Sequence, residues 1–176
     1  MSHTKKLVYT AVCTALCVVL PMAFHAFPNG GNIFLPMHIP VLLCGLSCSW
    51  QYGLLCGILG PVLSHLLNGM PPAAVLPSMT VECAVYGAAS GILMALVHTK
   101  KPILDLYISQ ISAMLLGRVV AGLVKGLILA PGTPLFAWVT TSFVTGLPGV
   151  VIQLLLLPAV VLALTKARLI PDRDLR

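Results

Sequence analysis

The chain has 176 residues, of which 59% are hydrophobic and 8% are charged, and its mean hydropathy is +1.03. Because a soluble domain carries about 25% charged residues, this composition excludes a water-soluble globular protein. The ten Lys and Arg outnumber the four Asp and Glu, but they are scattered at the ends of apolar runs. This distribution argues against a nucleic-acid-binding protein and for a membrane protein.

The apolar runs are continuous rather than alternating, as in membrane-spanning helices. Glycines, prolines and polar residues divide the runs. We expect an all-α integral membrane protein, a bundle of six transmembrane helices that forms one domain over residues 1–176. The predicted helices cover residues 5–24, 37–48, 51–68, 79–98, 102–130 and 136–168.

The first predicted helix carries two small residues, Ala11 and Ala15, one turn apart. Residues spaced by four share a face of a helix, and small residues let another backbone approach closely in lipid. No helix of the bundle obviously needs this strip, so we expect it to dock another subunit. The six cysteines lie inside apolar runs without CxxC spacing, and we interpret them as packing residues rather than metal ligands.

The second segment, "NIFLPMHIPVLLCGL" at residues 32–46, places polar and helix-disrupting residues where hydropathy predicts membrane. Pro36 and Pro40 flank His38, and a helix over 37–48 is too short to cross a hydrocarbon core of ~30 Å. Irregular backbone at membrane depth is tolerated only where it packs in protein or lines a cavity. We therefore predict that this segment forms the rim of a cavity that opens outward.

Several predicted helices contain glycines at a spacing of four. The pairs are Gly53/Gly57, Gly87/Gly91 and Gly122/Gly126. Such pairs let helix backbones approach closely in lipid, so they predict a packed bundle and carry no information about function.

Basic residues cluster on one face of the predicted topology. They precede the first helix, join the fourth to the fifth and follow the sixth: Lys5, Lys6, Lys100, Lys101, Lys166, Arg168, Arg173 and Arg176. The loops on the opposite face, "FPNGGN", "NGMPP" and "PGTP", contain no charged residue. The positive-inside rule makes the basic face cytoplasmic, so we expect both termini inside the cell (N-in/C-in).

Between Lys6 and Lys100 the only charged residue is Glu82, and between Asp105 and Lys166 the only ones are Arg118 and Lys125. All three lie inside predicted spans. An ionisable group there costs at least ~2.5–3.5 kcal/mol and usually faces protein or water. At 1.5 Å per residue, Arg118 lies roughly 24 Å along the fifth helix, so all three converge on the outer half of the membrane. Glu82 and Arg118 either form a buried ion pair or contact a ligand, and these roles do not exclude each other. Lys125 either faces the cavity or extends to the headgroups.

Cationic side chains that face the cavity, and whose charge is not fully neutralised by an acidic side chain, would favour an anionic ligand, typically a carboxylate. Further polar side chains are predicted at the same depth, from the first loop and from the second, third, fourth and sixth helices. They are Asn29, Asn32, His38, His65, Asn68, Tyr86 and Gln153. Together with the three ionisable residues, these are the candidate substrate-binding residues, and we expect neither catalytic residues nor metal ligands.

With these features, the chain resembles the substrate-binding S components of energy-coupling factor (ECF) vitamin transporters. The resemblance covers essentially the whole chain and is carried by the Ala11/Ala15 strip, "LPMHIPVLLCGL", "YGLLCGILGPVLSHLLNGMPP" and "MTVECAVYGAASGIL". It implies a multi-pass protein of the bacterial cytoplasmic membrane that captures a vitamin in an outward pocket. It also implies that the subunit topples in the membrane when it docks, through the alanine strip, on a coupling subunit with two cytoplasmic ATPases.

The chain contains no GxxxxGK[ST] motif, so we expect no enzymatic activity and no cofactor in it, with ATP used by the partner ATPases. "FLPMHIPVLLCG" and "GMPP" look most like the group of pantothenate and folate S components. Pantothenate, a small carboxylate with hydroxyls and an amide, suits the predicted cations and polar groups. Folate, cobalamin, pyridoxine and thiamine precursors are the alternative vitamins.

Three other functions are compatible with the sequence. A membrane hydrolase needs a nucleophile and a base, or clustered metal ligands, and only His65 with Glu82 would supply a candidate pair. A membrane scaffold would not explain why the intramembrane charges share one depth. A secondary transporter that works without an energising module is the third alternative.

Overall fold

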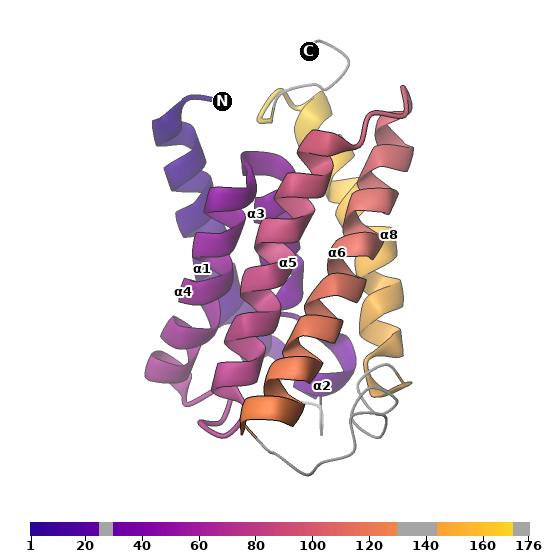
Figure 1. The fold of residues 1–176 in the computed structure, drawn as a ribbon. Coiled ribbons are helices and arrows are strands. Elements are labelled where there is room, and N and C mark those ends of the chain that lie inside the picture. Colours follow the sequence, from indigo (N-terminus) through magenta and orange to yellow (C-terminus); the bar gives the residue numbers. More distant parts are fainter. Residues whose placement is uncertain (25–29, 130–143, 171–176) are drawn as a thin grey trace.

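A computed structural model describes residues 1–24, 30–129 and 144–170, and the regular elements of these ranges are helices (Figure 1). They are α1 (His3–Phe24), α2 (Gly30–Phe34), α3 (His38–Cys48), α4 (Trp50–Asn68), α5 (Leu76–Leu96), α6 (Pro102–Val124), the π-helix η1 (Lys125–Leu129) and α8 (Leu147–Lys166). The predicted all-α class is confirmed for the described residues.

The long helices run up and down alongside one another. The N-terminus, the last turn of α8 and the connection between α5 and α6 lie at one end of the bundle, which we call the terminal end (Figure 1). The short helix α2 and the connection between α4 and α5 lie at the other end, which we call the α2 end. The basic segments that flank α1 and α8 and join α5 to α6 therefore share one end, as the charge pattern predicted.

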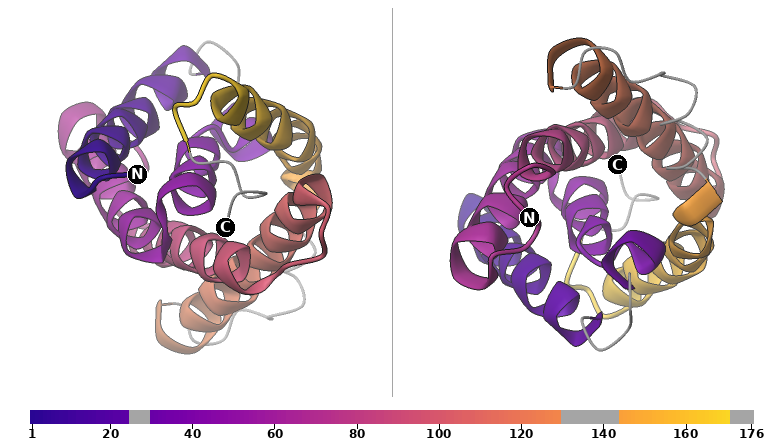
Figure 2. Two further views of the ribbon diagram at one scale, coloured as in Figure 1. Left: turned by 90° about the horizontal axis from the view of Figure 1, so that it is seen from above. Right: turned by 90° about the horizontal axis from the view of Figure 1, so that it is seen from below.

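The helix α3 lies inside the bundle. Both end views in Figure 2 show the other long helices arranged around it, and most of its 11 residues are buried. A helix of this length measures roughly 16 Å, about half of a ~30 Å hydrocarbon core. Because it is apolar on all sides, it is suited to burial among other helices rather than to a free surface.

Four helical segments are long and apolar enough to cross a membrane: α1, α5, Pro102–Leu127 and α8. The helix α4 has 19 residues but carries polar residues near its ends, including Gln51, His65 and Asn68. Together the apolar helices support a multi-pass membrane protein. The count of six spans stays a prediction.

The loop predicted between the first two helices contains a short helix, α2, at Gly30–Phe34. The sequence did not indicate it, because two glycines and an asparagine are poor helix formers. Tertiary packing accounts for it: Gly149 at the start of α8 lies directly against the backbone of Ile33 and Phe34. A side chain larger than hydrogen at Gly149 would separate α2 from α8.

The last two predicted helices also differ from the observed elements. The helix expected over 102–130 changes from α to π geometry at Lys125. Of the helix expected over 136–168, the structure describes α8 from Leu147 to Lys166; the predicted start lies outside the described residues. Pro148 stands in the first turn of α8, a position that proline favours because its missing N–H has no partner there.

The contact of α3 and α4 with α5 depends on glycines. A Cβ added at Gly53 would collide with the Gly87 carbonyl, and one added at Gly87 would collide with the Gly53 backbone. Cβ atoms added at Gly45 and Gly57 would likewise collide with the backbone of α5. The close packing predicted for the glycine pairs of α4 and α5 is thus confirmed, since backbone meets backbone at these points.

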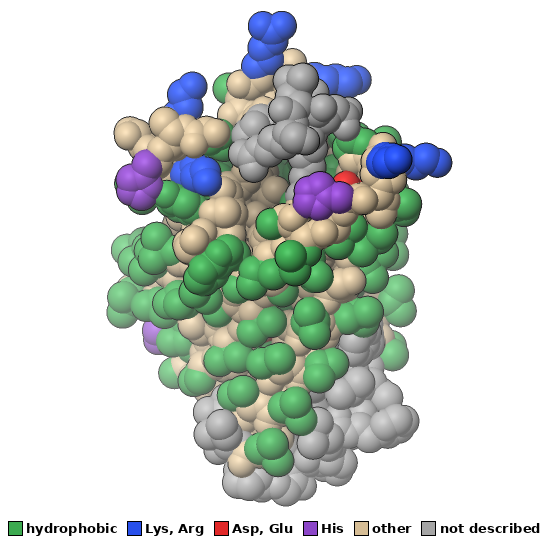
Figure 3. All heavy atoms as spheres, turned by 45° about the horizontal axis from the view of Figure 1, so that its top comes forward, with side chains coloured by type: hydrophobic (Ala, Val, Ile, Leu, Met, Phe, Trp, Pro, Cys, Tyr) green, Lys and Arg blue, Asp and Glu red, His purple; other side chains and the backbone are tan. Residues whose placement is uncertain are grey.

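The side of the bundle is apolar. In Figure 3 hydrophobic side chains cover the flank, while Lys and Arg side chains gather toward the terminal end. On α1, the exposed fractions of Val8, Val12 and Val19 are 60%, 55% and 57%. A continuous apolar surface of this kind is unfavourable in water and suits contact with lipid or another membrane protein.

We predict that Gly87→Ala destabilises the bundle. The added methyl group would meet the backbone of Gly53, which has no flexible end to move aside, and overpacking costs about 1–3 kcal/mol. The measurement is the midpoint of thermal unfolding of the detergent-solubilised protein, which should fall by several degrees. Gly31→Ala is the matched control, because nothing lies within 4 Å of a Cβ built there. Equal midpoints for the two variants would contradict the close α4–α5 contact.

Candidate functional site

The turn between α2 and α3 places a histidine inside the bundle. Leu35 has a φ of +49°, in the left-handed region that side chains rarely adopt, and its carbonyl accepts a hydrogen bond from the backbone N–H of His38 at 3.1 Å. Pro36, Met37 and His38 are buried. The Cys17 thiol of α1 donates to the Met37 carbonyl at 3.6 Å. The segment is irregular and buried, as its prolines indicated. That it forms the rim of an outward cavity stays a prediction.

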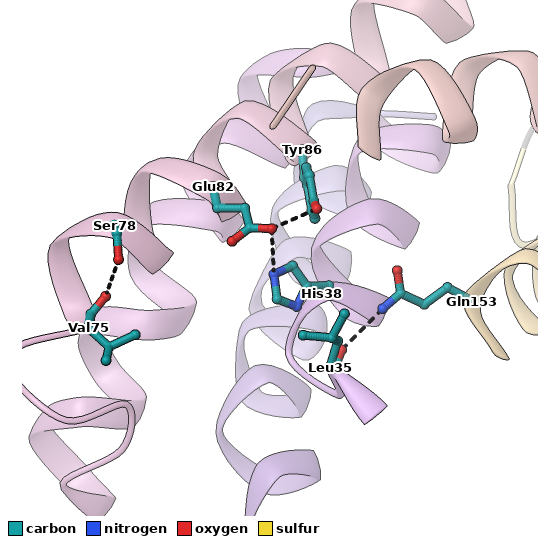
Figure 4. Close-up of polar contacts among 7 residues, drawn as sticks. All are labelled: Leu35, His38, Val75, Ser78, Glu82, Tyr86 and Gln153. Atoms are coloured by element: carbon teal, nitrogen blue, oxygen red, sulfur yellow. Dashed lines mark hydrogen bonds and ion pairs between the residues drawn. The ribbon is translucent and has the colours of Figure 1, made fainter. Parts of the chain in front are cut away.

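Three side chains from α3 and α5 converge beside this turn (Figure 4). The Tyr86 hydroxyl donates to Glu82 Oε1 at 2.7 Å. His38 Nε2 lies 3.7 Å from the same oxygen, which is an electrostatic contact rather than a hydrogen bond. The rings of His38 and Tyr86 are 5.1 Å apart and tilted by 56°. We call these three residues the polar cluster.

Glu82 is the member of the polar cluster that is most accessible to solvent. The exposed fractions of the His38 and Glu82 side chains are 1% and 15%, and Tyr86 is buried. Glu82 and Tyr86 stand one turn apart on α5, the spacing at which helical side chains meet. A ligand that enters at the α2 end would therefore meet the carboxylate first and the two rings behind it.

The helix α6 packs against the polar cluster from another side. The Tyr86 ring lies on the backbone of Gly117, where an added Cβ would collide with it. The next residue, Arg118, is 4% exposed. Its place directly after Gly117 brings its backbone close to the Tyr86 ring and the Glu82 backbone. Its role in ligand binding stays a prediction. A direct ion pair between Arg118 and Glu82 stays a prediction.

The helix α8 joins the site through an amide. Gln153 is fully buried, and its Nε2 donates to the Leu35 carbonyl at 3.3 Å (Figure 4). The backbone carbonyl of Gln153 accepts a hydrogen bond from Gln110 Nε2 of α6 at 2.8 Å. A chain of hydrogen bonds therefore links α6, α8 and the turn that carries His38.

Two predicted site residues bond to backbone elsewhere. His65 Nδ1 lies 2.7 Å from the Pro71 carbonyl, which fixes the connection after α4. Asn68 Nδ2 donates to the Val18 carbonyl at 3.4 Å, which ties the end of α4 to α1. These contacts give both residues a structural role, and the histidine beside Glu82 is His38 rather than His65.

The remaining predicted residues lie outside the polar cluster or outside the described positions. Asn29 and the side chain of Asn32 are not among the described positions. Lys125 begins η1 and is partly exposed, so its role in ligand binding stays a prediction. Ala11 and Ala15 are both exposed on α1, as a docking strip requires.

Sequence reasoning missed Gln110, which is as deeply buried as Gln153. The available signal was a glutamine in the middle of an apolar run, where an amide needs a partner inside the protein. The sequence shows only that such a partner is needed. Its identity, a backbone carbonyl on another helix, depends on how α6 and α8 pack.

The polar cluster has the chemistry of a binding site for a small molecule. It combines a carboxylate, an imidazole and a phenol with a nearby guanidinium, so it can donate and accept hydrogen bonds and pair with either charge. Among the residues that the structure describes, no group of three His, Cys, Asp or Glu side chains is placed to hold a metal ion.

A cavity of about 330 Å³ opens at the terminal end, at the opposite end of α3 from His38. Lys6, Ser47, Thr165 and Lys166 are among its lining residues. It shares no residue with the polar cluster, and the intramembrane ionisable residues do not line it. We therefore place the candidate ligand site at the cluster rather than in this cavity.

Comparison with known proteins gives one match. The family model described as "ECF transporter, substrate-specific component" matches residues 5–161, nearly the whole chain. No curated protein and no solved structure matches the chain.

We predict that Tyr86→Phe destabilises the protein. The change removes the hydroxyl that donates to Glu82 Oε1, and a hydrogen bond to a charged group contributes about 1.5–3 kcal/mol. The thermal midpoint in detergent should fall, whereas Tyr107→Phe, a change at a partly exposed tyrosine of α6, should leave it within error of the wild type. A Tyr86→Phe protein as stable as the wild type would show that Glu82 does not depend on this hydroxyl.

Proposed function

The chain belongs to the family of substrate-specific components of ECF transporters, and we propose that it is the subunit that captures a vitamin, with pantothenate as the preferred ligand. As a member of this family it is a transporter subunit with a small-molecule substrate and energising partners, and not an enzyme. Its delivery of the ligand across the bacterial cytoplasmic membrane is part of the proposal.

The observation that carries this proposal is the polar cluster with Arg118 beside it. In a chain with so few charges, the Glu82 carboxylate belongs to this cluster, and the buried Arg118 follows directly on Gly117, which packs against Tyr86 and the Glu82 backbone. Intramembrane ionisable groups are costly and mark ligand or ion sites. The site therefore suits a small polar molecule that enters from the face opposite to the basic residues.

Arg118 favours a ligand with a carboxylate. Its planar guanidinium can form two parallel hydrogen bonds to a carboxylate, which a lysine cannot reproduce. Pantothenate supplies a carboxylate for Arg118, and its hydroxyls and amide suit the donors and acceptors of His38, Glu82 and Tyr86. Folate, cobalamin, pyridoxine and thiamine precursors are the competing ligands in a binding panel.

Energy for uptake would come from partners. We propose that the chain topples on a shared transmembrane coupling subunit, with ATP used by two cytoplasmic ATPases. The exposed Ala11 and Ala15 of α1 would form the contact with the coupling subunit. The basic residues at the terminal end support an orientation with both termini in the cytoplasm, so the α2 end would face outward.

We predict that Arg118→Lys folds but binds pantothenate about ten- to hundredfold more weakly. Lysine keeps the positive charge but lacks the planar guanidinium that can bond both carboxylate oxygens. The loss of one charge-assisted hydrogen bond costs about 1.5–3 kcal/mol. The measurement is equilibrium binding of radiolabelled pantothenate, with the other vitamins as competitors, together with the thermal midpoint.

Arg168→Lys is the matched control, because it makes the same change at an exposed arginine of the terminal end; it should bind as the wild type does. An amide analogue that lacks the carboxylate should lose affinity for the wild type and little for Arg118→Lys. If Arg118→Lys binds normally while Arg118→Ala aggregates, Arg118 is a structural residue and the carboxylate assignment fails.

We predict that replacing Ala11 and Ala15 with leucine abolishes uptake and preserves ligand binding. Leucines on the exposed face of α1 would hold a partner backbone away without touching the polar cluster. Binding is measured on the purified subunit, and uptake in cells that contain the energising module. Ala159→Leu with Ala163→Leu is the matched control, since these alanines have the same spacing and are exposed on α8. Parallel loss of binding and uptake would assign the strip to internal packing.

A further inference from the structure

Two buried glutamines beside the polar cluster have side-chain oxygens that the protein leaves unbonded. Gln110 and Gln153 are 0% exposed. Within the described ranges, the Oε1 atoms of both have no hydrogen-bond partner, and neither ring nitrogen of His38 has one. Buried polar atoms are nearly always hydrogen-bonded, so the unbonded atoms of His38 and of two glutamines that are linked to its turn point to a group that the protein receives from outside.

The hydrogen bonds of the two amides determine what that group must be. Gln110 Nε2 donates to the Gln153 carbonyl, and Gln153 Nε2 donates to the Leu35 carbonyl. Exchanging the oxygen and nitrogen of either amide would bring two acceptors together, so the network assigns the orientation. Each glutamine therefore uses its donor to hold the protein together, and its free atom is an acceptor.

We propose that Gln110 and Gln153 form an acceptor subsite for the O–H groups at the neutral end of the ligand. We call it the amide subsite. This inference rests on the proposed function, in which Arg118 takes the carboxylate. The subsite requires a ligand that donates hydrogen bonds at one end, and it disfavours a ligand whose far end carries only acceptors, because acceptors would then face acceptors.

The positions of the two subsites on α6 set the size of the ligand. Gln110 and Arg118 are eight residues apart in the sequence, which corresponds to roughly 12 Å along a helix axis at 1.5 Å per residue. The long arginine side chain shortens the span between the groups that meet the ligand. A ligand that fits carries its carboxylate at one end and its donors several bonds away, as pantothenate does with its amide and hydroxyls.

A binding site built from acceptors discriminates between ligands by hydrogen bonding. An analogue that lacks the hydroxyls leaves the buried oxygens unpaired in the complex, which weakens its binding. Gln153 also holds the Leu35 carbonyl, which accepts the His38 N–H. A change at Gln153 would therefore disturb the turn, so Gln110 is the residue that tests the subsite.

The experiment begins with purified wild type and a panel of radiolabelled vitamins. The vitamin that binds, which we expect to be pantothenate, is then paired with an analogue that lacks its hydroxyl donors, such as dideoxypantothenate. Affinities of both compounds are measured for wild type, Gln110→Met and Gln51→Met. Methionine is close to glutamine in volume and removes the amide. Gln51 is an exposed glutamine at the start of α4 and is the matched control.

In the wild type and Gln51→Met, we expect the analogue to bind about three- to tenfold more weakly than pantothenate, the range of one neutral hydrogen bond. In Gln110→Met, pantothenate itself should bind more weakly and the preference over the analogue should fall below about twofold. Thermal midpoints, recorded in parallel, report whether each variant folds. If Gln110 binds the ligand hydroxyls, deleting the hydroxyls and the amide together should cost less affinity than the sum of the two separate losses. A glutamine with a merely structural role would not give this non-additivity.

The outcomes separate the two proposals. An unchanged preference in a folded Gln110→Met protein overturns the amide subsite and leaves vitamin binding intact. If Gln110→Met does not fold, wild-type protein that binds the analogue as tightly as pantothenate overturns the subsite equally. If the wild type binds none of the vitamins, the proposed function fails and the subsite fails with it.

Discussion

The position of α3 inside the bundle is the constraint on which the rest of the structure depends. An apolar helix of 11 residues cannot span a bilayer alone, so its backbone ends must be satisfied by neighbouring helices at membrane depth. The glycines of α4 and α5 make this possible, because they let the two helices meet backbone to backbone beside α3. The consequence is that His38, the first residue of α3, is buried in the bundle.

This placement explains why polar residues gather around the turn between α2 and α3. The Leu35 carbonyl receives both the His38 N–H and the Gln153 amide, and Glu82 receives the Tyr86 hydroxyl. Each contact satisfies a polar group that lipid could not satisfy. Because the contacts come from α3, α5 and α8, with α6 adding Arg118 and Gln110, the site exists only when the helices are assembled.

The sequence predicted those parts of the site that depend on residues close together along the chain. The prolines around His38 indicated broken, buried backbone, and the spacing of Glu82 and Tyr86 indicated a shared helix face. The all-α class followed from the composition and from the continuous, non-alternating apolar runs. The role of Gln110 and the existence of α2 depend on which helices pack together, and spacing along one helix carries no information about that. His65 was assigned to the site for its depth, yet depth does not exclude a backbone partner such as the Pro71 carbonyl.

The helix α1 connects the two surfaces that the proposed function requires. Its outer face exposes Ala11 and Ala15, and its inner face buries Cys13 and Cys17. The Cys17 thiol bonds to the Met37 carbonyl in the turn that carries His38. Ala15 of the proposed docking strip is therefore only two residues away from Cys17, which contacts the turn before His38 directly. If a partner docks on this strip as proposed, a shift of α1 would also move the backbone beside His38, and this would couple docking to ligand affinity through one helix.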